Sequence, residues 1–237
     1  MKKTILLFPF FFLPTFFSAD SESIQPGEYI ADGGGGTLTV RKEKGKTLFE
    51  INTIGANFHT CGLSGEVKNN RARLEAMDKE CVVTFTKKGR DVDVAQSGEE
   101  CRYYCGARAA FEGLYLEPAA GCSEAARAKT RKRFKELYDK KNYADALKDL
   151  APLLKTCART LGWIETGWIK NDIAITQYKL GDLTGCRETL SSFASEAAQS
   201  DDEVRNNYPP SDAETWLPVV KAARYNLGLC SKAQKKK

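Results

Sequence analysis

Histidine is almost absent from this sequence, and its scarcity excludes most imidazole-dependent chemistry. His59 is the one histidine among 237 residues. A Ser-His-Asp or Cys-His arrangement would have to use it, although no helix or nucleophile elbow is predicted around it. Fingerprints for nucleotides, flavins and haem are absent as well. We therefore expect no enzymatic activity and no cofactor, with an undetected hydrolase built on His59 or a carboxylate pair as the alternative.

The N-terminal apolar run is too short for a comfortable membrane span. It covers residues 5–17, follows Lys2 and Lys3, contains Pro9 and Pro14, and ends in small residues. This three-part layout is typical of a secretory signal peptide. We predict a signal peptide over residues 1–19, a periplasmic or secreted protein, and no stable membrane insertion after cleavage.

Cysteine, in contrast, is abundant, with eight residues. An exported chain with this many cysteines is expected to carry disulfides. A zinc site at Cys101 and Cys105 with His59 is possible from the spacing, but an oxidising compartment favours a disulfide, so we expect no metal. The predicted disulfide cysteines are Cys61, Cys81, Cys101, Cys105, Cys122, Cys157, Cys186 and Cys230.

The positive charge gives little reason to expect a nucleic-acid partner. The formal net charge is +5, and three lysines at residues 235–237 supply much of it. We interpret this tail as solvated rather than as a nucleic-acid or lipid patch. Length and composition are those of a globular protein with one large or two ordinary domains.

The first half of the chain has the period of two that is typical of strands. Short apolar runs from residue 27 to about residue 115 alternate with turn signals at 33–36, 43–46, 68–71 and 87–90. We predict a disulfide-containing antiparallel barrel or sandwich of seven to eight strands over residues 20–121. The glycines at 33–36 precede a strand instead of a helix, so they predict a hairpin loop and not a phosphate loop. The side chains expected inside are Leu38, Val40, Phe49, Ile51, Leu63, Val83, Phe85, Val92 and Val94.

Residues 101–122 are the segment of this half that is richest in cysteine, arginine and aromatic residues. Arg102, Tyr103 and Arg108 are types that contribute strongly to protein interfaces, so the segment is a candidate binding edge. We favour the alternative that Phe111 and Tyr115 pack the last strand while disulfides hold a corner.

The second half changes to a helical period. In residues 130–157 apolar side chains recur three, four and seven positions apart on both sides of a polar break at 139–142. Such spacing predicts two amphipathic helices joined by a short turn. A similar break, with Gly181 and Asp182, divides residues 169–193, and a third helix is predicted over residues 219–232.

This half resembles the tetratricopeptide (TPR) repeat family. Ala146 in the first unit, Gly181 at the second turn, and Tyr225 to Gly228 in the third helix carry the resemblance. It implies an all-α array over residues 122–237, whose first helices line a concave face that binds a peptide or a partner protein. Candidate binding residues on these helices, with plain packing as the alternative role, are Lys132, Lys135, Asn171, Gln177, Tyr178, Arg224 and Asn226.

The repeat geometry of that family also implies disulfide partners. In a stacked hairpin the end of the second helix lies beside the start of the first. The implied pairs are Cys122 with Cys157 and Cys186 with Cys230; Cys61 and Cys81 would then share the sheet, leaving Cys101 with Cys105.

The sequence therefore leaves two non-enzymatic functions open within an α+β multidomain fold. The first is an adaptor of the bacterial envelope that binds a protein or peptide. The alternative is a periplasmic inhibitor or immunity protein that acts on a peptidoglycan hydrolase or a delivered toxin. Small exported barrels resemble bacterial lysozyme inhibitors, and residues 85–89, with Lys87, resemble the Thr-Lys-Gly loop of one such family.

Overall fold

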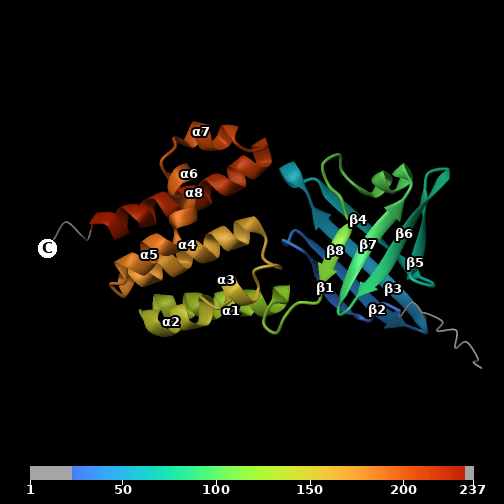
Figure 1. Cartoon of the computed structure of the whole chain (residues 1–237), viewed down its shortest axis with the longest axis horizontal. Helices are drawn as coiled ribbons and strands as arrows, with labels where there is room; N and C mark the ends of the chain where they lie inside the picture. Colours follow the sequence, from blue (N-terminus) through green and yellow to red (C-terminus); the bar gives the residue numbers. More distant parts are fainter. Residues whose placement is uncertain (1–22, 233–237) are drawn as a thin grey trace, which may run out of the picture.

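The computed structural model describes residues 23–232 and consists of an antiparallel sheet followed by helices (Figure 1). The predicted α+β organisation is therefore confirmed. The expected signal peptide, residues 1–19, and the lysine tail, residues 235–237, lie outside the described residues.

Eight strands form a single meander that curls into a near-barrel. Their order is β4-β3-β2-β1-β8-β7-β6-β5, so every strand except β4 and β5 at the two edges has two neighbours. The pairing of β1 with β8 brings the two ends of the meander together. Where the edges meet, Leu74 of β5 packs against Gly65 of β4, at which a Cβ would lie 2.7 Å from Leu74 Cδ2. The strands are β1 Gly27–Ala31, β2 Gly36–Glu43, β3 Lys46–Ile54, β4 Thr60–Val67, β5 Arg71–Ala76, β6 Lys79–Lys88, β7 Asp91–Ser97 and β8 Gly113–Leu116.

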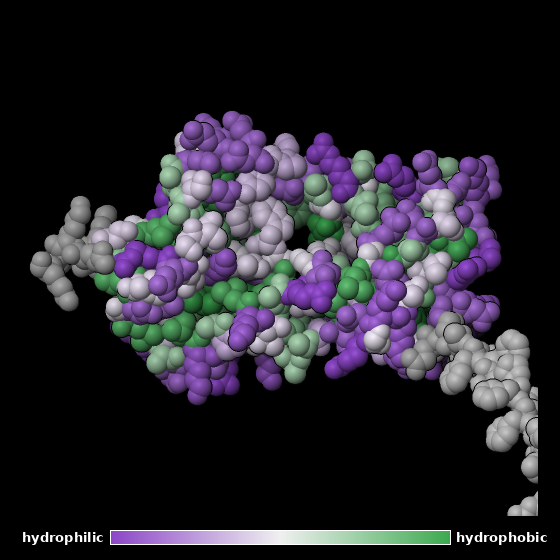
Figure 2. Space-filling model, in the orientation of Figure 1, coloured by the Kyte–Doolittle hydropathy of each residue, from purple (hydrophilic) through white to green (hydrophobic). Residues whose placement is uncertain are grey.

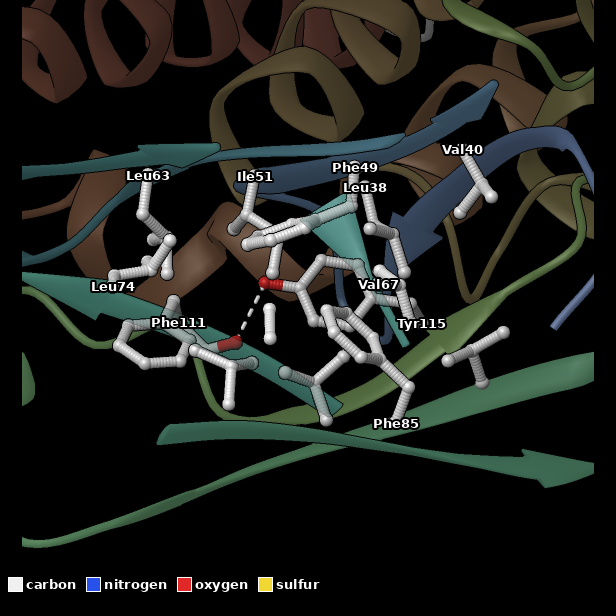
Figure 3. Close-up of a cluster of buried hydrophobic side chains, with 14 of the residues drawn as sticks. Leu38, Val40, Phe49, Ile51, Leu63, Val67, Leu74, Phe85, Phe111 and Tyr115 are labelled. Carbon is white, nitrogen blue, oxygen red and sulfur yellow. Dashed lines mark hydrogen bonds between the residues drawn. The ribbon is translucent and has the colours of Figure 1, made fainter. Parts of the chain in front are cut away.

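Alternation along the strands fills the barrel with apolar side chains. All nine side chains predicted to point inward are buried, which confirms the period-two reading of the sequence. Figure 3 shows this core, in which the rings of Phe49 and Phe85 meet edge to face with centroids 5.0 Å apart. Phe111 and Tyr115 also pack there, as predicted, and the Tyr115 hydroxyl donates to the Phe111 carbonyl at 2.7 Å (Figure 3).

The connection from β7 to β8 is pinned to the barrel by two disulfides. It contains the 3-10 helix η2, Glu99–Tyr104, which contacts β4, β5 and β6. Cys101 bonds to Cys81 of β6, and Cys105 bonds to Cys61 of β4. The predicted pairs Cys61–Cys81 and Cys101–Cys105 are therefore wrong. The physical reason is that η2 lies across the seam between β4 and β6, so Cys101 within it and Cys105 directly after it reach different strands.

The second half is a set of packed helices, with α1 and α2 as one hairpin and α4 and α5 as another. The Ser123 side chain accepts a hydrogen bond from Ala126 N and so caps α1. The turn between α4 and α5 uses Gly181 at φ 80°, a conformation that favours glycine. The helices are α1 Glu124–Asp139, α2 Tyr143–Leu150, α3 Leu153–Thr156, α4 Trp163–Lys179, α5 Leu183–Thr189, α6 Ala194–Ala197, α7 Asp201–Asn206 and α8 Pro210–Lys232, with 3-10 turns η1 Ala56–Phe58 and η3 Ser191–Phe193.

The last helix is longer than its pattern predicts. The sequence indicates a helix over residues 219–232, but α8 begins nine residues earlier, at Pro210, and continues through Pro218. Proline suits the first turn of a helix, where its missing N–H is not needed. An interior proline usually marks a helix end, and this is why the pattern appeared to start after Pro218.

The disulfides of the helical half match the pairs that the repeat geometry implied. Cys122 bonds to Cys157, and Cys186 of α5 bonds to Cys230 of α8. With the two bridges in the sheet they make four, which is typical of a protein that folds in an oxidising compartment outside the cytoplasm. No helix in the described part of the chain combines the length and the apolar character needed to cross a membrane.

Candidate functional site

The turn between β1 and β2 packs directly against the helical half, and we name this interaction the glycine contact. Gly33 N donates to the Arg159 carbonyl at 2.6 Å, and a Cβ at Gly34 would lie 2.4 Å from Gly162 N. The two backbones therefore lie directly against each other, which requires glycine at position 34. Asp32 also binds the Arg159 guanidinium, and this hydrogen bond holds the pKa of the Asp32 carboxyl below its usual value. The hairpin loop predicted at residues 33–36 thus also joins the two halves.

A second bridge, the asparagine contact, links the connection from β3 to β4 with the start of α8. Asn57 N donates to Asp212 Oδ2 at 2.9 Å, and Ser211 N donates to Asn57 Oδ1 at 2.9 Å. Asn57 has φ 59°, a left-handed conformation that asparagine tolerates better than most residues. The reciprocal pair satisfies an N–H at the start of α8, so the helix end is capped by the sheet half.

Between these two contacts lies a space that we name the junction hollow. The large side chains that lie nearest to the two contacts along the chain are Ile54 and Phe58 in the sheet half, and Trp163 and Tyr208 in the helical half. On the sheet side, Ile54 N donates to Gly35 O at 2.7 Å beside the glycine contact, and Phe58 follows Asn57 at the other. On the helical side, Trp163 follows Gly162. Figure 2 shows the hollow as a gap between the helices on the left and the sheet on the right.

Large apolar side chains gather around this hollow and remain exposed. The exposed fractions are 56% for Ile54, 43% for Phe58 and 45% for Trp163. Trp163 stacks on Tyr208 at 5.7 Å and 13°, and Trp216 supports it from behind with ring centroids 4.7 Å apart. Exposed apolar side chains that gather in one region of a surface are typical of an interaction site.

Glu196 fixes the orientation of the aromatic rings on the helical side. It accepts hydrogen bonds from the Tyr208 hydroxyl and, at 3.0 Å, from Trp216 Nε1. Burial, together with the hydrogen bond to Glu196 and its charge, raises the pKa of Tyr208 to about 12. Tyr208 therefore keeps its proton near neutral pH, and the rings are held in place before any ligand arrives.

Arg108 lies close to the sheet side of the hollow. Its backbone lies against the segment that carries Ile54, because a Cβ at Gly55 would come within 2.1 Å of Arg108 O. The Arg108 side chain is exposed, and within residues 23–232 no carboxylate pairs with it. The hollow thus combines aromatic rings, aliphatic surface and a guanidinium, the composition of protein interfaces.

Several of the predicted binding residues lie between helices instead of at a ligand surface. Asn171 of α4 donates to Gly167 O and Val219 O, both at 3.1 Å, and Asn226 of α8 donates to Asn171 Oδ1 at 3.1 Å. Both asparagines are buried. Arg224 donates to the carbonyls of residues 197 and 199 and pairs with Asp201.

The remaining predicted residues are spread over three places. Gln177 accepts a hydrogen bond from Thr189 of α5, and Tyr178 packs partly buried against the core near α8. Lys132 and Lys135 are exposed on α1, where Lys135 pairs with Asp139. The structure brings together Asn171 and Asn226, but leaves the two lysines of α1 apart from them.

Lys87 lies near the end of β6, next to the turn from β6 to β7. In a meander alternate turns fall at opposite ends, so the turn from β6 to β7 is on the other side from the turns that form the two contacts. Lys87 borders two hollows there, of about 450 and 390 Å³. Among residues 23–232 no group of three His, Cys, Asp or Glu side chains is arranged to hold a metal ion.

The junction hollow escaped the sequence analysis because its residues come from three separate segments. Each is an isolated apolar residue near a turn or a helix start, without a periodic pattern. Two signals pointed toward it: the aromatic and arginine content of residues 101–122, and the run of glycines at 33–36. Comparisons with protein families, curated proteins and solved structures found no match to this chain.

Proposed function

We propose that this protein is a non-enzymatic, exported binding protein that holds a partner protein in the junction hollow. The observation that carries the proposal is the exposure of Ile54, Phe58 and Trp163 next to the two contacts between the sheet and the helices. Exposed aromatic and aliphatic side chains at the centre of an interface contribute most of its binding energy. The four disulfides support a periplasmic or secreted site of action.

The partner we propose presents an apolar side chain next to an acidic one. The apolar side chain fits between the stacked rings of Trp163 and Tyr208 and the opposite wall of Ile54 and Phe58. The acidic neighbour complements Arg108 at the rim, and such a pair contributes to specificity and to the association rate. The concave face of the helices is the weaker candidate, because several of its amide and guanidinium donors are used inside the fold.

The test compares matched pairs of exposed apolar residues as baits in an envelope extract. The double variant Ile54→Ser/Trp163→Ser removes two walls of the hollow. The control Met77→Ser/Tyr225→Ser removes two side chains that are 83% and 66% exposed but lie elsewhere. We expect the wild type and the control variant to capture the same protein. The amount captured by the hollow variant should be lower by at least about tenfold.

Arg108→Glu tests the charge of the partner. Reversal of the charge should weaken capture of the same protein, and the loss should shrink at high salt, where surface charges are screened. Equal capture by the hollow variant and the control variant would refute the junction hollow as the binding site.

A second proposal is that the barrel inhibits a peptidoglycan hydrolase through the turn that carries Lys87. The observation in its favour is the position of Lys87 beside two hollows. The rate of peptidoglycan hydrolysis should fall in the presence of the wild type, and recover with Lys87→Ala. An unchanged rate with the wild-type protein across a panel of hydrolases would rule this out.

A further inference from the structure

One of the four disulfides is more accessible than the others. Seven of the eight cysteines are buried, each with an exposed fraction of at most 2%, whereas Cys105 is only partly buried. Its partner in the disulfide, Cys61 of β4, is 1% exposed. A dissolved thiol must approach a sulfur directly to react with it, so Cys105 is the cysteine that such a thiol would meet first.

The surroundings of Cys105 favour reaction with a thiol. Arg102 and Arg108 lie three residues to either side of it, and both are exposed. Cys105 N donates to Arg102 O at 3.0 Å, which closes the 3-10 turn before it. Within residues 23–232 no carboxylate pairs with either arginine. Positive charge near a partly exposed cysteine stabilises its thiolate, the form that takes part in disulfide exchange.

The segment from Cys101 to Phe111 is fixed at both ends and held in the middle by this disulfide. Cys101 bonds to Cys81, and Phe111 is buried in the core of the barrel. Between these ends the Cys61–Cys105 bond is the covalent anchor. Without it, the middle of the segment would be held by non-covalent contacts alone. These include the hydrogen bonds from Gly106 N to Thr60 O, from the Tyr104 hydroxyl to Glu75 O and from Thr53 Oγ1 to Ala110 O.

The same segment supports the connection from β3 to β4, which carries two apolar side chains of the junction hollow. A Cβ at Gly55, the residue after Ile54, would come within 2.1 Å of Arg108 O. A Cβ at Gly106 would lie 2.8 Å from His59 Nδ1. Release of the segment would therefore leave Ile54 and the rest of this connection without that support.

We propose that the Cys61–Cys105 disulfide is a thiol-exchange site, at which a dithiol reductant releases residues 102–110 and so loosens the sheet side of the junction hollow. A thiolate of the reductant attacks Cys105 Sγ, the bond between the two Sγ atoms breaks, and Cys61 leaves as a thiolate that takes up a proton. The second thiolate of the reductant then attacks its own sulfur in the mixed disulfide and releases Cys105. Two electrons pass to the protein, and the reductant becomes a disulfide. Exposed disulfides are typically the labile and regulatory ones.

The experiment uses the full disulfide-bonded chain, with dithiothreitol as the dithiol. Reduction under native conditions is stopped with acid at a series of times, the chain is unfolded, and free thiols are labelled with N-ethylmaleimide and assigned by mass spectrometry. We expect Cys61 and Cys105 to be reduced at least about tenfold faster than the other six cysteines, which are all buried. Equal rates for the four disulfides, or faster reduction of another one, would overturn the proposal.

Amide hydrogen exchange tests the release of the segment. After reduction of this disulfide, protection should fall at residues 53–60 and 102–110 and persist in β6, β7 and α8. Cys61→Ser/Cys105→Ser should show the same pattern without a reductant. The matched control Cys122→Ser/Cys157→Ser removes a buried disulfide of the helical half and should leave residues 102–110 protected. Unchanged protection at residues 102–110 in the reduced wild type, which depends on no variant folding, would refute the release.

The effect on binding rests on the proposed function and is measured separately. Capture of the partner by the wild type should fall by about tenfold when this disulfide is reduced, because the sheet side of the hollow is then no longer preorganised. Equal capture by the oxidised and the reduced protein would overturn the control of binding by this disulfide. The variant Ile54→Ser/Trp163→Ser, kept oxidised, tests the junction hollow itself, so the two failures give different results.

Discussion

The sheet and the helices differ in how they use buried polar side chains. Among the described residues that are buried and polar or charged, one belongs to the sheet and six to the helical half. They are Thr53 in the sheet, and Arg127, Thr160, Asn171, Thr176, Asp212 and Asn226 in the helical half.

The difference follows from how each half pairs the N–H and C=O groups of its backbone. Strands form hydrogen bonds to their neighbours through the backbone itself, so the barrel needs few buried polar side chains. A helix satisfies its backbone internally, so its neighbours are fixed by packing and by side chains that cross between helices. Arg127 shows this role, because it binds both the Cys122 carbonyl and Glu165 of α4. In the helical half, Arg127, Asn171 and Asn226 thus help to specify which helices meet.

Phe85→Ala should have the largest effect, and it should fall on the sheet. The Phe85 ring is 1% exposed and packs on Phe49, so its removal leaves a cavity and should cost about 3–5 kcal/mol of unfolding free energy. Denaturant unfolding measures the loss, and amide hydrogen exchange locates it. If the halves are stabilised separately, protection should fall in β1 to β8 and persist in α4 and α8. An equal loss of protection in both halves would show one cooperative unit instead.

Asn226→Ala should destabilise the helices by a smaller amount. The variant removes the donor to Asn171 and leaves that buried amide short of a partner, at a cost of about 1–3 kcal/mol. Exchange should rise in α4 and α8 and stay unchanged in the strands. The matched control is Asn206→Ala, which alters an exposed position of α7 and should change stability by less than about 0.5 kcal/mol. A similar result for both variants would contradict the role given to the buried amides.

Gly34→Ala should disturb the joint between the halves while leaving each core intact. Gly33 and Gly34 have φ +88° and +76°, so alanine at either position carries similar strain, about 1–2 kcal/mol. At Gly34 the new Cβ would also strike Gly162, whereas nothing lies within 4 Å of a Cβ at Gly33. We expect Gly34→Ala alone to lengthen the molecule in small-angle X-ray scattering and to change Trp163 fluorescence. Identical scattering profiles for the two variants would refute the glycine contact as the fixed joint.

The sheet was largely predictable from the sequence, because every second side chain of a strand points to the same face and so has the same polarity. Leu38, Val40, Phe49 and Ile51 alternate with polar residues, and each is buried as expected. The four turns predicted from Gly, Asn and Lys signals each separate two strands. The alternating pattern does not predict how the long connection from β7 to β8 runs over the barrel. The disulfide partners of Cys101 and Cys105 therefore could not be deduced.

The helices of the second half were largely predictable, but which of their polar side chains are exposed was not. Apolar periodicity placed α1, α2, α4 and α5, yet short helices such as α6 and α7 have too few turns to show a period. A polar residue on a helix looks the same in sequence whether it faces water or ties two helices together. Asn171 and Asn226 were for that reason expected at a binding face, although they bond to each other inside the fold.

The disulfides also determine how the molecule would respond to tension along the chain. The bonds Cys61–Cys105, Cys122–Cys157 and Cys186–Cys230 close successive spans of 44, 35 and 44 residues, and the Cys81–Cys101 bond lies within the first. A force applied at the two termini passes through each sulfur bridge and bypasses the enclosed segment. Under tension, only the segments outside the three disulfide-closed loops can extend. The contour length of the molecule stays limited until a reductant opens a loop.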